Sequence, residues 1–351
     1  MKVLQDLSYD ELKTLVGEAG EKAYRALQIF KGLAQGKKIS EITDISKSFR
    51  EKLIEEYVDA AVEIIEIKTS KIDGTKKLLF KLHDGNVIEG VVMKYKYGNT
   101  QCVSTQVGCR MGCAFCASGI GGLVRNLSAG EIYAEITAVN RLLGGTTDKR
   151  QITNVVLMGS GEPLDNYDNT IKFLRLLSDE NGLNVSPRNV SLSTCGLVPN
   201  IYRLADEGLD VNLTVSLHNP FDEKRKELMP IAKKYKVKEI LDACSAYFDK
   251  TGRRYIFEYS LVKGQNDGKE CADELIRLLK GRPCHVNLIR LNDVKEKNLT
   301  ATSDKDAYRF MTLLNKGGIS ATVRRQMGVD IDGACGQLRR KFLNGEGNGS
   351  D

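Results

Sequence analysis

The sequence has only three histidines among its 351 residues and no long apolar run. A helix that spans a membrane needs roughly 18 or more consecutive apolar residues, and no stretch approaches that length. The first residues, Met-Lys-Val-Leu-Gln-Asp, also lack the apolar core of a signal peptide. We therefore expect a cytoplasmic protein without a membrane partner.

Neither sign of charge dominates the composition. The chain has 52 Lys and Arg against 46 Asp and Glu, a net charge of +6. So mild an excess permits an RNA partner, but it is equally typical of a solvated surface of mixed charge. The cysteine count of nine is odd, and in a reducing compartment it favours metal ligands, catalytic groups or buried apolar side chains over a disulfide framework.

Three of these cysteines, Cys109, Cys113 and Cys116, are separated by three and then two residues. Three thiolates at this spacing can hold three corners of a [4Fe–4S] cluster, and no fourth cysteine follows at a ferredoxin-like spacing. One iron would stay open to chelate a small molecule. A zinc knot is the alternative, but it normally needs four ligands, and no histidine lies within twenty residues of the segment. A chance run of buried cysteines is the third interpretation.

The spacing of apolar residues predicts a helical N-terminal region and then strands. Residues 4–58 indicate short amphipathic helices whose basic outer residues could follow a phosphate backbone or be plainly solvated. Strands Lys76–His83 and Val87–Met93 flank an Asp-Gly-Asn turn, which predicts a hairpin. Further on, Ser128 and Glu131 form a capping-box pattern that opens a helix to about Leu143.

From there strand and helix patterns alternate, which is typical of βα units on a parallel sheet. The predicted strands are Ile152–Met158, Asn189–Ser193, Val211–Leu217, Tyr255–Leu261, Cys284–Leu291 and Ile319–Arg324. The predicted helices between them are Thr170–Leu177, Ile201–Glu207, Val237–Phe248, Lys269–Leu279 and Lys305–Asn315. The fold class is therefore α/β, a partial (β/α) barrel with a small N-terminal helical accessory domain and a β-hairpin extension.

We divide the chain into a helical accessory domain (1–60, a candidate for RNA binding), a β-hairpin linker region (61–100), the barrel with a C-terminal catalytic loop (101–342), and a disordered tail (343–351). In barrels of this kind the chemistry gathers at the carboxyl ends of the strands. The polar candidates do follow predicted strands. They are Gly161 and Glu162, Ser193, Ser216 with His218, and Asn292.

Two cysteines outside the triplet stand apart from the remaining four. Cys102 lies seven residues before the first cluster cysteine, and Cys335 lies in a polar loop of small residues near the end of the chain. Such a pair could exchange between thiols and a disulfide. The other four follow apolar patterns and are interpreted as buried filler: Cys195, Cys244, Cys271 and Cys284.

The C-x-x-x-C-x-x-C segment resembles the signature of radical SAM enzymes. With Cys102, the triplet, Gly161-Glu-Pro-Leu164, Ser216-Leu-His218 and the Cys335 loop in one order, the chain resembles the RlmN family of dual-specificity RNA methyltransferases. The resemblance covers nearly everything from Leu4 to Phe342. It implies methylation of C2 of an adenine in 23S rRNA at the peptidyl transferase centre and in tRNA just 3′ of the anticodon. It also implies two cofactors, a [4Fe–4S] cluster and S-adenosyl-L-methionine (SAM).

The resemblance further implies residue roles. Cys335 would carry a methyl group from one SAM as S-methylcysteine, a second SAM would generate the radical that activates it, and Cys102 would release the product by forming a disulfide with Cys335. Glu89 matches the family's proton acceptor, although its strand position alone indicates a solvent-facing glutamate. The implied SAM contacts are Gly161, Glu162, Ser193, Ser216, Leu217, His218 and Asn292.

Several alternatives stay open at this point. The Cfr enzymes methylate C8 of the same rRNA adenine and share these cysteines, but they typically have alanine where this chain has Pro163, so the C2 product is favoured. A non-catalytic iron–sulfur electron-transfer protein would leave Cys335 without a role. A zinc-stabilised RNA-binding module is the third alternative. The radical chemistry also requires a low-potential electron donor, whose identity the sequence does not indicate. We expect the protein to be a monomer.

Overall fold

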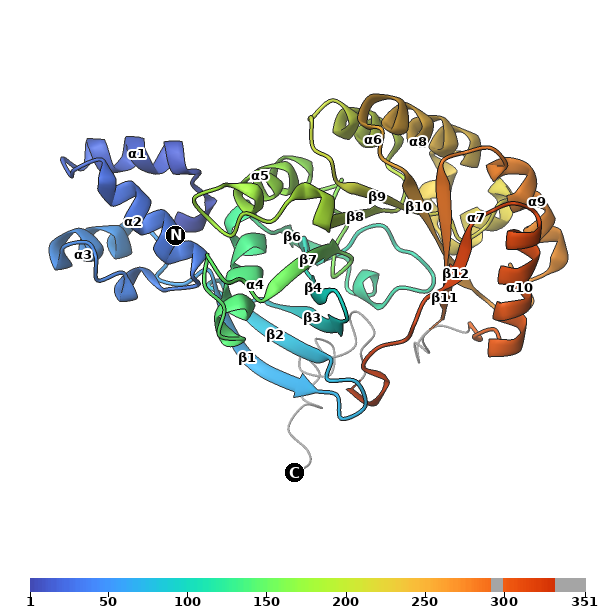
Figure 1. Ribbon diagram of the computed structural model, residues 1–351, viewed down its shortest axis with the longest axis horizontal. Coiled ribbons are helices and arrows are strands. Elements are labelled where there is room, and N and C mark those ends of the chain that lie inside the picture. The colour runs from blue at the N-terminus through green and yellow to red at the C-terminus, as the bar shows by residue number, and fades with distance from the viewer. Residues whose placement is uncertain (292–298, 332–351) are drawn as a thin grey trace.

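The structure, a computed structural model, describes residues 1–291 and 299–331. Two residues of the predicted site, Asn292 and Cys335, lie outside these ranges. The described chain forms three N-terminal helices followed by a large α/β unit (Figure 1). No helix within these ranges is both long enough and apolar enough to cross a membrane.

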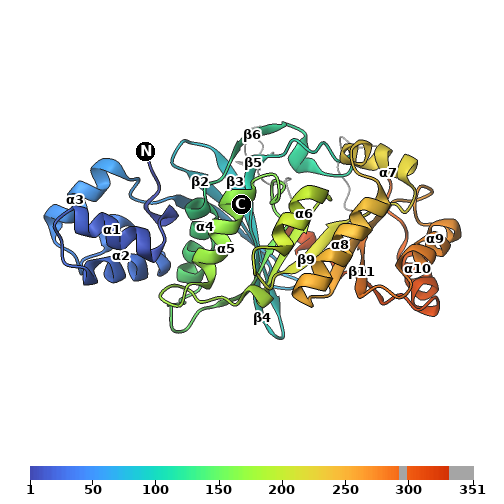
Figure 2. The same ribbon diagram turned by 90° about the horizontal axis from the view of Figure 1, so that it is seen from above.

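The N-terminal helices are α1 (Tyr9–Glu18), α2 (Tyr24–Ala34) and α3 (Lys47–Glu56). Helix α1 begins at a capping box between Ser8 and Glu11, which satisfies two backbone amides that the first turn leaves free. Apolar side chains from all three helices join the main hydrophobic core. Glu41 also accepts hydrogen bonds of 2.5 and 3.0 Å from Arg141 of helix α4 (Ala129–Leu142). The three helices therefore pack against the α/β unit at one end of the molecule (Figure 2).

One continuous sheet of ten strands organises the rest of the described chain. Its strands in spatial order are β1 (Val62–Thr69), β2 (Lys76–Leu82), β3 (Val87–Tyr95), β4 (Gly98–Cys102), β7 (Ile152–Leu157), β8 (Val190–Thr194), β9 (Asn212–Ser216), β10 (Tyr255–Leu261), β11 (Cys284–Arg290) and β12 (Ala321–Val323). The first four strands pair antiparallel, and those from β4 to β12 pair parallel. Two short strands, β5 (Gln106–Gly108) and β6 (Leu123–Asn126), form a separate antiparallel pair.

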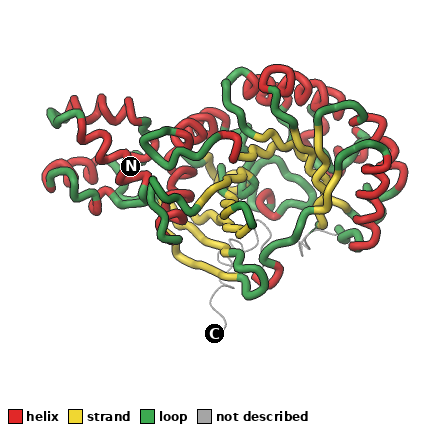
Figure 3. The backbone as a smooth tube through the Cα atoms, viewed as in Figure 1, coloured by secondary structure: helices red, strands yellow, loops and turns green. Residues whose placement is uncertain are grey.

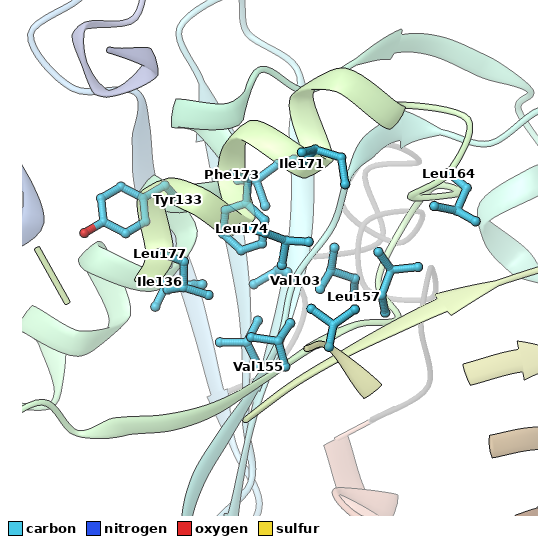
Figure 4. Close-up of a cluster of buried hydrophobic side chains, with 14 of the residues drawn as sticks. Val103, Tyr133, Ile136, Val155, Leu157, Leu164, Ile171, Phe173, Leu174 and Leu177 are labelled. Carbon is cyan, nitrogen blue, oxygen red and sulfur yellow. The ribbon is translucent and has the colours of Figure 1, made fainter. Parts of the chain in front are cut away.

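Helices line the outer side of the curved sheet (Figures 2 and 3). After α4 they are α5 (Tyr167–Ser178), α6 (Val198–Ala205), α8 (Val237–Thr251), α9 (Lys269–Leu279) and α10 (Asp304–Lys316). The short helix α7 (Asp222–Leu228) instead lies at the carboxyl ends of the strands, beside the loop between β5 and β6 (Figure 2). Figure 4 shows the packing between helices and strands, where Ile136 of α4 and Leu174 of α5 lie over Val155 of β7. Burial of side chains of this size stabilises the fold by roughly 1.5–3 kcal/mol each.

The partial barrel, its N-terminal helices and the hairpin extension agree with the predicted fold class. Strand β10 and helix α9 have the predicted bounds, and the Asp-Gly-Asn turn is closed by Asp84, which accepts the amide of Asn86 at 3.0 Å.

Strand β4 was not among the predicted strands, because its sequence Gly-Asn-Thr-Gln-Cys has no apolar alternation. It becomes a strand since β3 and β7 supply hydrogen bonds on both of its edges. Helix α7 was missed for a similar reason, because Asp-Glu-Lys-Arg-Lys-Glu-Leu shows no apolar stripe.

Candidate active site

The cysteine triplet lies on the loop between β5 and β6, and this short antiparallel pair fixes both ends of the loop. The amide of Cys109 donates to the carbonyl of Gly122 at 2.9 Å, and the amide of Ala114 donates to Leu228 at 2.8 Å. Met111, Cys113 and Phe115 pack against a small apolar cluster around Met229. The loop is therefore held on one side by β6 and on the other by the segment after α7.

This loop faces a cavity of about 270 Å³ at the carboxyl ends of the parallel strands. The sequence-predicted residues that line it are Cys109, Cys113, Cys116, Gly161, Glu162, Ser193, Ser216 and His218. These residues come from four separate stretches of the chain, and the parallel sheet brings them together. The cavity is also lined by residues that the sequence did not single out for this role: Thr194, Cys195, Met229, Glu258, Ser260 and Arg324.

Two glycines after β7 form the floor of the cavity by close backbone contact. A Cβ atom at Gly159 would lie 2.6 Å from the carbonyl oxygen of Val103, and one at Gly161 would lie 2.7 Å from the backbone nitrogen of Gln106. Gly161 also has a φ of +113°, which side chains rarely tolerate. Larger residues cannot replace either glycine without moving the strand beside it.

Glu162 lines the cavity but is already engaged by the backbone. Its Oε2 accepts the amide of Cys195 at 2.7 Å, and its Oε1 accepts the amide of Leu164 at 3.0 Å. Burial raises the pKa of this carboxyl, and the bonds from backbone amides oppose that effect. Each oxygen keeps a second lone pair, so the carboxylate can still accept from a ligand's ammonium group.

His218 has the left-handed φ of +56°, and two hydrogen bonds hold it there. Its Nδ1 accepts the amide of Ser260 at 2.9 Å, and its carbonyl accepts from Asn266 at 2.6 Å. The ring meets Phe115 edge to face with centroids 4.5 Å apart. Burial lowers the pKa of His218 to about 3, so the ring is neutral, carries its proton on Nε2, and can donate from that atom.

Arg225 of α7 fixes the strand ends beneath this site. Its side chain is fully buried, Nε donates to the carbonyl of Leu217 at 3.0 Å, and Nη2 donates to the carbonyls of Cys195 and Ser216 at 2.9 and 3.0 Å. Leu217 itself is buried in the main core and does not line the cavity. Cys195, interpreted as core filler from the sequence, instead forms part of the cavity wall.

The donor set fits a [4Fe–4S] cluster better than a single metal ion. Within residues 1–291 and 299–331, no three Cys, His, Asp or Glu side chains converge on one point as a single ion would require. A cubane cluster takes each thiolate on a different iron and so needs its ligands spread around it. Cys109, Cys113 and Cys116 would hold the cluster, and the glycines, Glu162, Ser193, Ser216 and His218 surround the space beside it.

Cys102 and Glu89 share the inner face of the neighbouring strands β4 and β3. Cys102 pairs with Val91, two residues from Glu89 on the same face, and it packs near Met158, which lines the cavity. Glu89 is only 2% exposed, and its Oε2 lies 3.7 Å from Nζ of Lys77. The expectation of a solvent-facing glutamate was therefore wrong, because both faces of β3 are covered.

The segment that follows β12 crosses to the turn between β1 and β2. There Asp330 accepts hydrogen bonds from Ser70 Oγ at 2.6 Å and from the amide of Lys71 at 2.9 Å, while Asp73 accepts the amide of Gly328 at 2.9 Å. The chain is thus fixed to the hairpin extension five residues before position 335. Cys335 itself lies outside the described residues.

Comparison with known proteins gives two family matches. The radical SAM superfamily matches residues 103–279, and the family described as the ribosomal RNA large subunit methyltransferase N-terminal domain matches residues 3–58. The first range contains the cysteine triplet and the strands from β5 to β10, and the second contains the N-terminal helices.

Relatives and one solved structure agree with these matches over the whole chain. A probable dual-specificity RNA methyltransferase RlmN of Clostridium perfringens is 52% identical over 99% of both chains, and one of Lachnospira eligens is 49% identical over 98% of this chain and 97% of its own. The crystal structure of a radical SAM methyltransferase from Sphaerobacter thermophilus superposes with a TM-score of 0.91. That protein is 42% identical and the alignment covers 96% of this chain and 99% of the other.

Proposed function

Since the chain belongs to the radical SAM superfamily and, within it, to the RlmN family of RNA methyltransferases, we propose that it methylates C2 of an adenine in both 23S rRNA and tRNA. The observation that carries this proposal is the position of Cys102 and Glu89 on one inner face of the sheet, beside the cavity that the cluster cysteines line. An electron-transfer protein would need neither residue there.

A [4Fe–4S] cluster and SAM supply a carbon-centred radical when they are bound, which is needed because an aromatic C2–H carbon is too weak a nucleophile for direct methyl transfer. The protein's own residues then carry and release the methyl group. We assign the methyl carrier to Cys335, whose sulfur would hold the carbon that bonds to C2. Glu89 would accept the C2 proton, and its burial beside Lys77 keeps water away from that transfer. Because the adduct is a radical, one electron must also leave it, to be taken up by the bound cluster.

Release requires that the bond between the Cys335 sulfur and the methyl carbon breaks. Attack by the Cys102 thiolate on that sulfur forms a disulfide, and the electron pair of the broken bond takes up a proton to complete the methyl group. Cys102 is 5% exposed at the end of β4, which limits the access of other thiols to its sulfur. The target base must leave its stack to reach the cavity, as in other enzymes that modify bases.

The test is anaerobic reconstitution with iron and sulfide, followed by reaction with SAM, a reductant and protein-free 23S rRNA or tRNA. Nucleoside mass spectrometry should detect 2-methyladenosine from both RNAs. Cys335→Ala should abolish it, whereas Cys244→Ala, which changes a cysteine fully buried on α8, should leave the product unchanged. A product of 8-methyladenosine would place the chain with the C8 enzymes, and product from Cys335→Ala would contradict the cysteine mechanism.

A further inference from the structure

A row of polar side chains crosses three neighbouring strands on the face that lines the cavity. In the sheet register Ser216 of β9 pairs with Glu258 of β10, and Glu258 pairs with Asn287 of β11. Adjacent parallel strands lie about 4.8 Å apart, so the three side chains stand side by side on one face. Ser216 and Glu258 both line the cavity, and Asn287 supports Glu258 from the next strand.

Among the described residues, one oxygen of Glu258 has a hydrogen-bond partner and the other has none. Oε1 accepts the Asn287 amide at 3.0 Å, whereas Oε2 is buried and has no hydrogen-bond partner among residues 1–291 and 299–331. The guanidinium of Arg324 lies beside this oxygen, with Nη1 at 4.0 Å from Oε2, the outer limit of an ion pair. The residue is 4% exposed, and its burial raises the pKa of the carboxyl while Arg324 and Asn287 lower it.

Leaving a buried carboxylate oxygen without a donor is energetically costly, and proteins rarely do so without a reason. Here the oxygen that lacks a donor within the described part of the chain belongs to a residue that lines a cavity, and a neighbouring hydroxyl on Ser216 lies in the same row. A ligand that places a hydroxyl or amino group against this row would satisfy Oε2. Ser216 could then donate to, or accept from, an adjacent group of the same ligand.

We infer that Glu258 is a nucleoside-binding residue, whose Oε2 accepts a hydrogen bond from a hydroxyl or amino group of an adenosine bound in the cavity. Two adenosines can supply this chemistry. One is the nucleoside of SAM, through its ribose hydroxyls. The other is the target nucleotide, through its exocyclic amine, and this second source rests on the proposed function.

The test variant is Glu258→Gln, which can keep the bond from Asn287 but turns the atom facing the cavity from an acceptor into a donor. Glu135→Gln is the matched control. Glu135 of α4 is also fully buried, its pKa is also raised by burial, and its Oε1 also lacks a partner among the described residues, but it does not line the cavity. If Glu258→Gln does not fold, Glu258→Asp retracts the carboxylate by one methylene and serves the same comparisons.

The first measurement is equilibrium binding of SAM and of its 2′-deoxy and 3′-deoxy analogues to the cluster-loaded proteins. If the ribose is the source, Glu258→Gln weakens SAM binding by about tenfold or more and loses the parent's preference for SAM over one analogue. This arm uses no RNA and no methylation, so its outcome does not depend on the proposed reaction.

The second measurement is binding of RNA that carries adenosine or purine riboside, which lacks the amine, at the target position. If the target base is the source, the parent prefers adenosine by about tenfold, and Glu258→Gln loses that preference while its SAM affinity is unchanged. The inference is overturned if Glu258→Gln retains both SAM affinity and the preference for adenosine, or if Glu135→Gln shows the same losses.

Discussion

Replacing Arg225 should weaken both the fold and SAM binding, because its guanidinium holds the carboxyl ends of two strands. The side chain is fully buried and donates three hydrogen bonds of 2.9–3.0 Å, to the carbonyls of Cys195, Ser216 and Leu217. In Arg225→Met the carbonyls of Cys195 and Ser216 lose this donor, whereas the carbonyl of Leu217 still accepts the amide of Asn219 at 2.7 Å. Each unsatisfied buried carbonyl costs about 1–3 kcal/mol, and removal of a buried cation offsets part of that cost.

The expected net loss is about 3 kcal/mol. A chain of this length has an unfolding entropy near 0.7 kcal/mol/K at its midpoint, so the loss corresponds to a fall in Tm of about 4 °C. Arg225→Lys should fall between the parent and Arg225→Met, because one ammonium cannot reproduce a planar fork that reaches three carbonyls. Since Cys195 and Ser216 line the cavity, SAM affinity should fall by roughly tenfold in the methionine variant.

The assay is thermal unfolding of the cluster-loaded protein under anaerobic conditions, together with equilibrium binding of SAM. Arg253→Lys is the matched control. Arg253 is partly buried at the amino end of β10, away from the cavity, and donates to Asn212 at 2.5 Å. We expect the control to lower Tm by no more than about 2 °C and to leave SAM affinity unchanged. The reasoning is refuted if Arg225→Met melts within about 1 °C of the parent and binds SAM equally well.

Three further predictions concern single residues of the site and its supports. Burial lowers the pKa of His218 in the folded chain to about 3, from an ordinary value near 6.5. As the pH falls, the unfolded chain therefore takes up a proton on this ring before the folded chain does. Stability should therefore fall as pH drops below about 6.5, by up to about 1.4 kcal/mol per pH unit, and urea titrations should show a shallower acid slope for His218→Asn. Gly161→Ala should abolish detectable SAM binding by equilibrium dialysis, since its Cβ would meet backbone at 2.7 Å, whereas Gly121→Ala, with open space around it, should bind normally. Asp330→Ala should slow RNA methylation several-fold, because it removes two hydrogen bonds that hold the segment after β12 to the hairpin extension. Asp59→Ala removes the same kind of serine contact in the N-terminal region and should leave the rate unchanged. Equal methylation rates for Asp330→Ala and the parent would contradict this prediction.

Much of the fold could be predicted from local spacing. The alternation of strands and helices, the capping box at Ser128 and the turn at Asp84 all depend on residues within a few positions of one another, and the structure has each of them. The cysteine triplet is local in the same sense, because three ligands on one loop lie close together in almost any fold that holds the loop. The cofactors and the family followed from that triplet and from short motifs in a fixed order.

The structure corrected the predictions at residues whose surroundings come from distant parts of the chain. Glu89 has the pattern of a solvent-facing strand residue, but it is buried, because residues on both faces of β3 are covered. Arg225 lies in a short charged helix with no apolar stripe, yet its guanidinium is buried beneath two strand ends.

The sequence by itself determined the parallel α/β architecture, the loop of the three cluster cysteines and the glycine turn after β7, since each depends on residues that are neighbours along the chain. Only the tertiary structure decided that Ser216, Glu258 and Asn287 form one row facing the cavity. These residues lie on three strands separated by helices, and the register of hydrogen bonds between the strands aligns them. The spacing of residues within each strand does not show this register, because the register depends on how the strands pair and on how the helices between them pack.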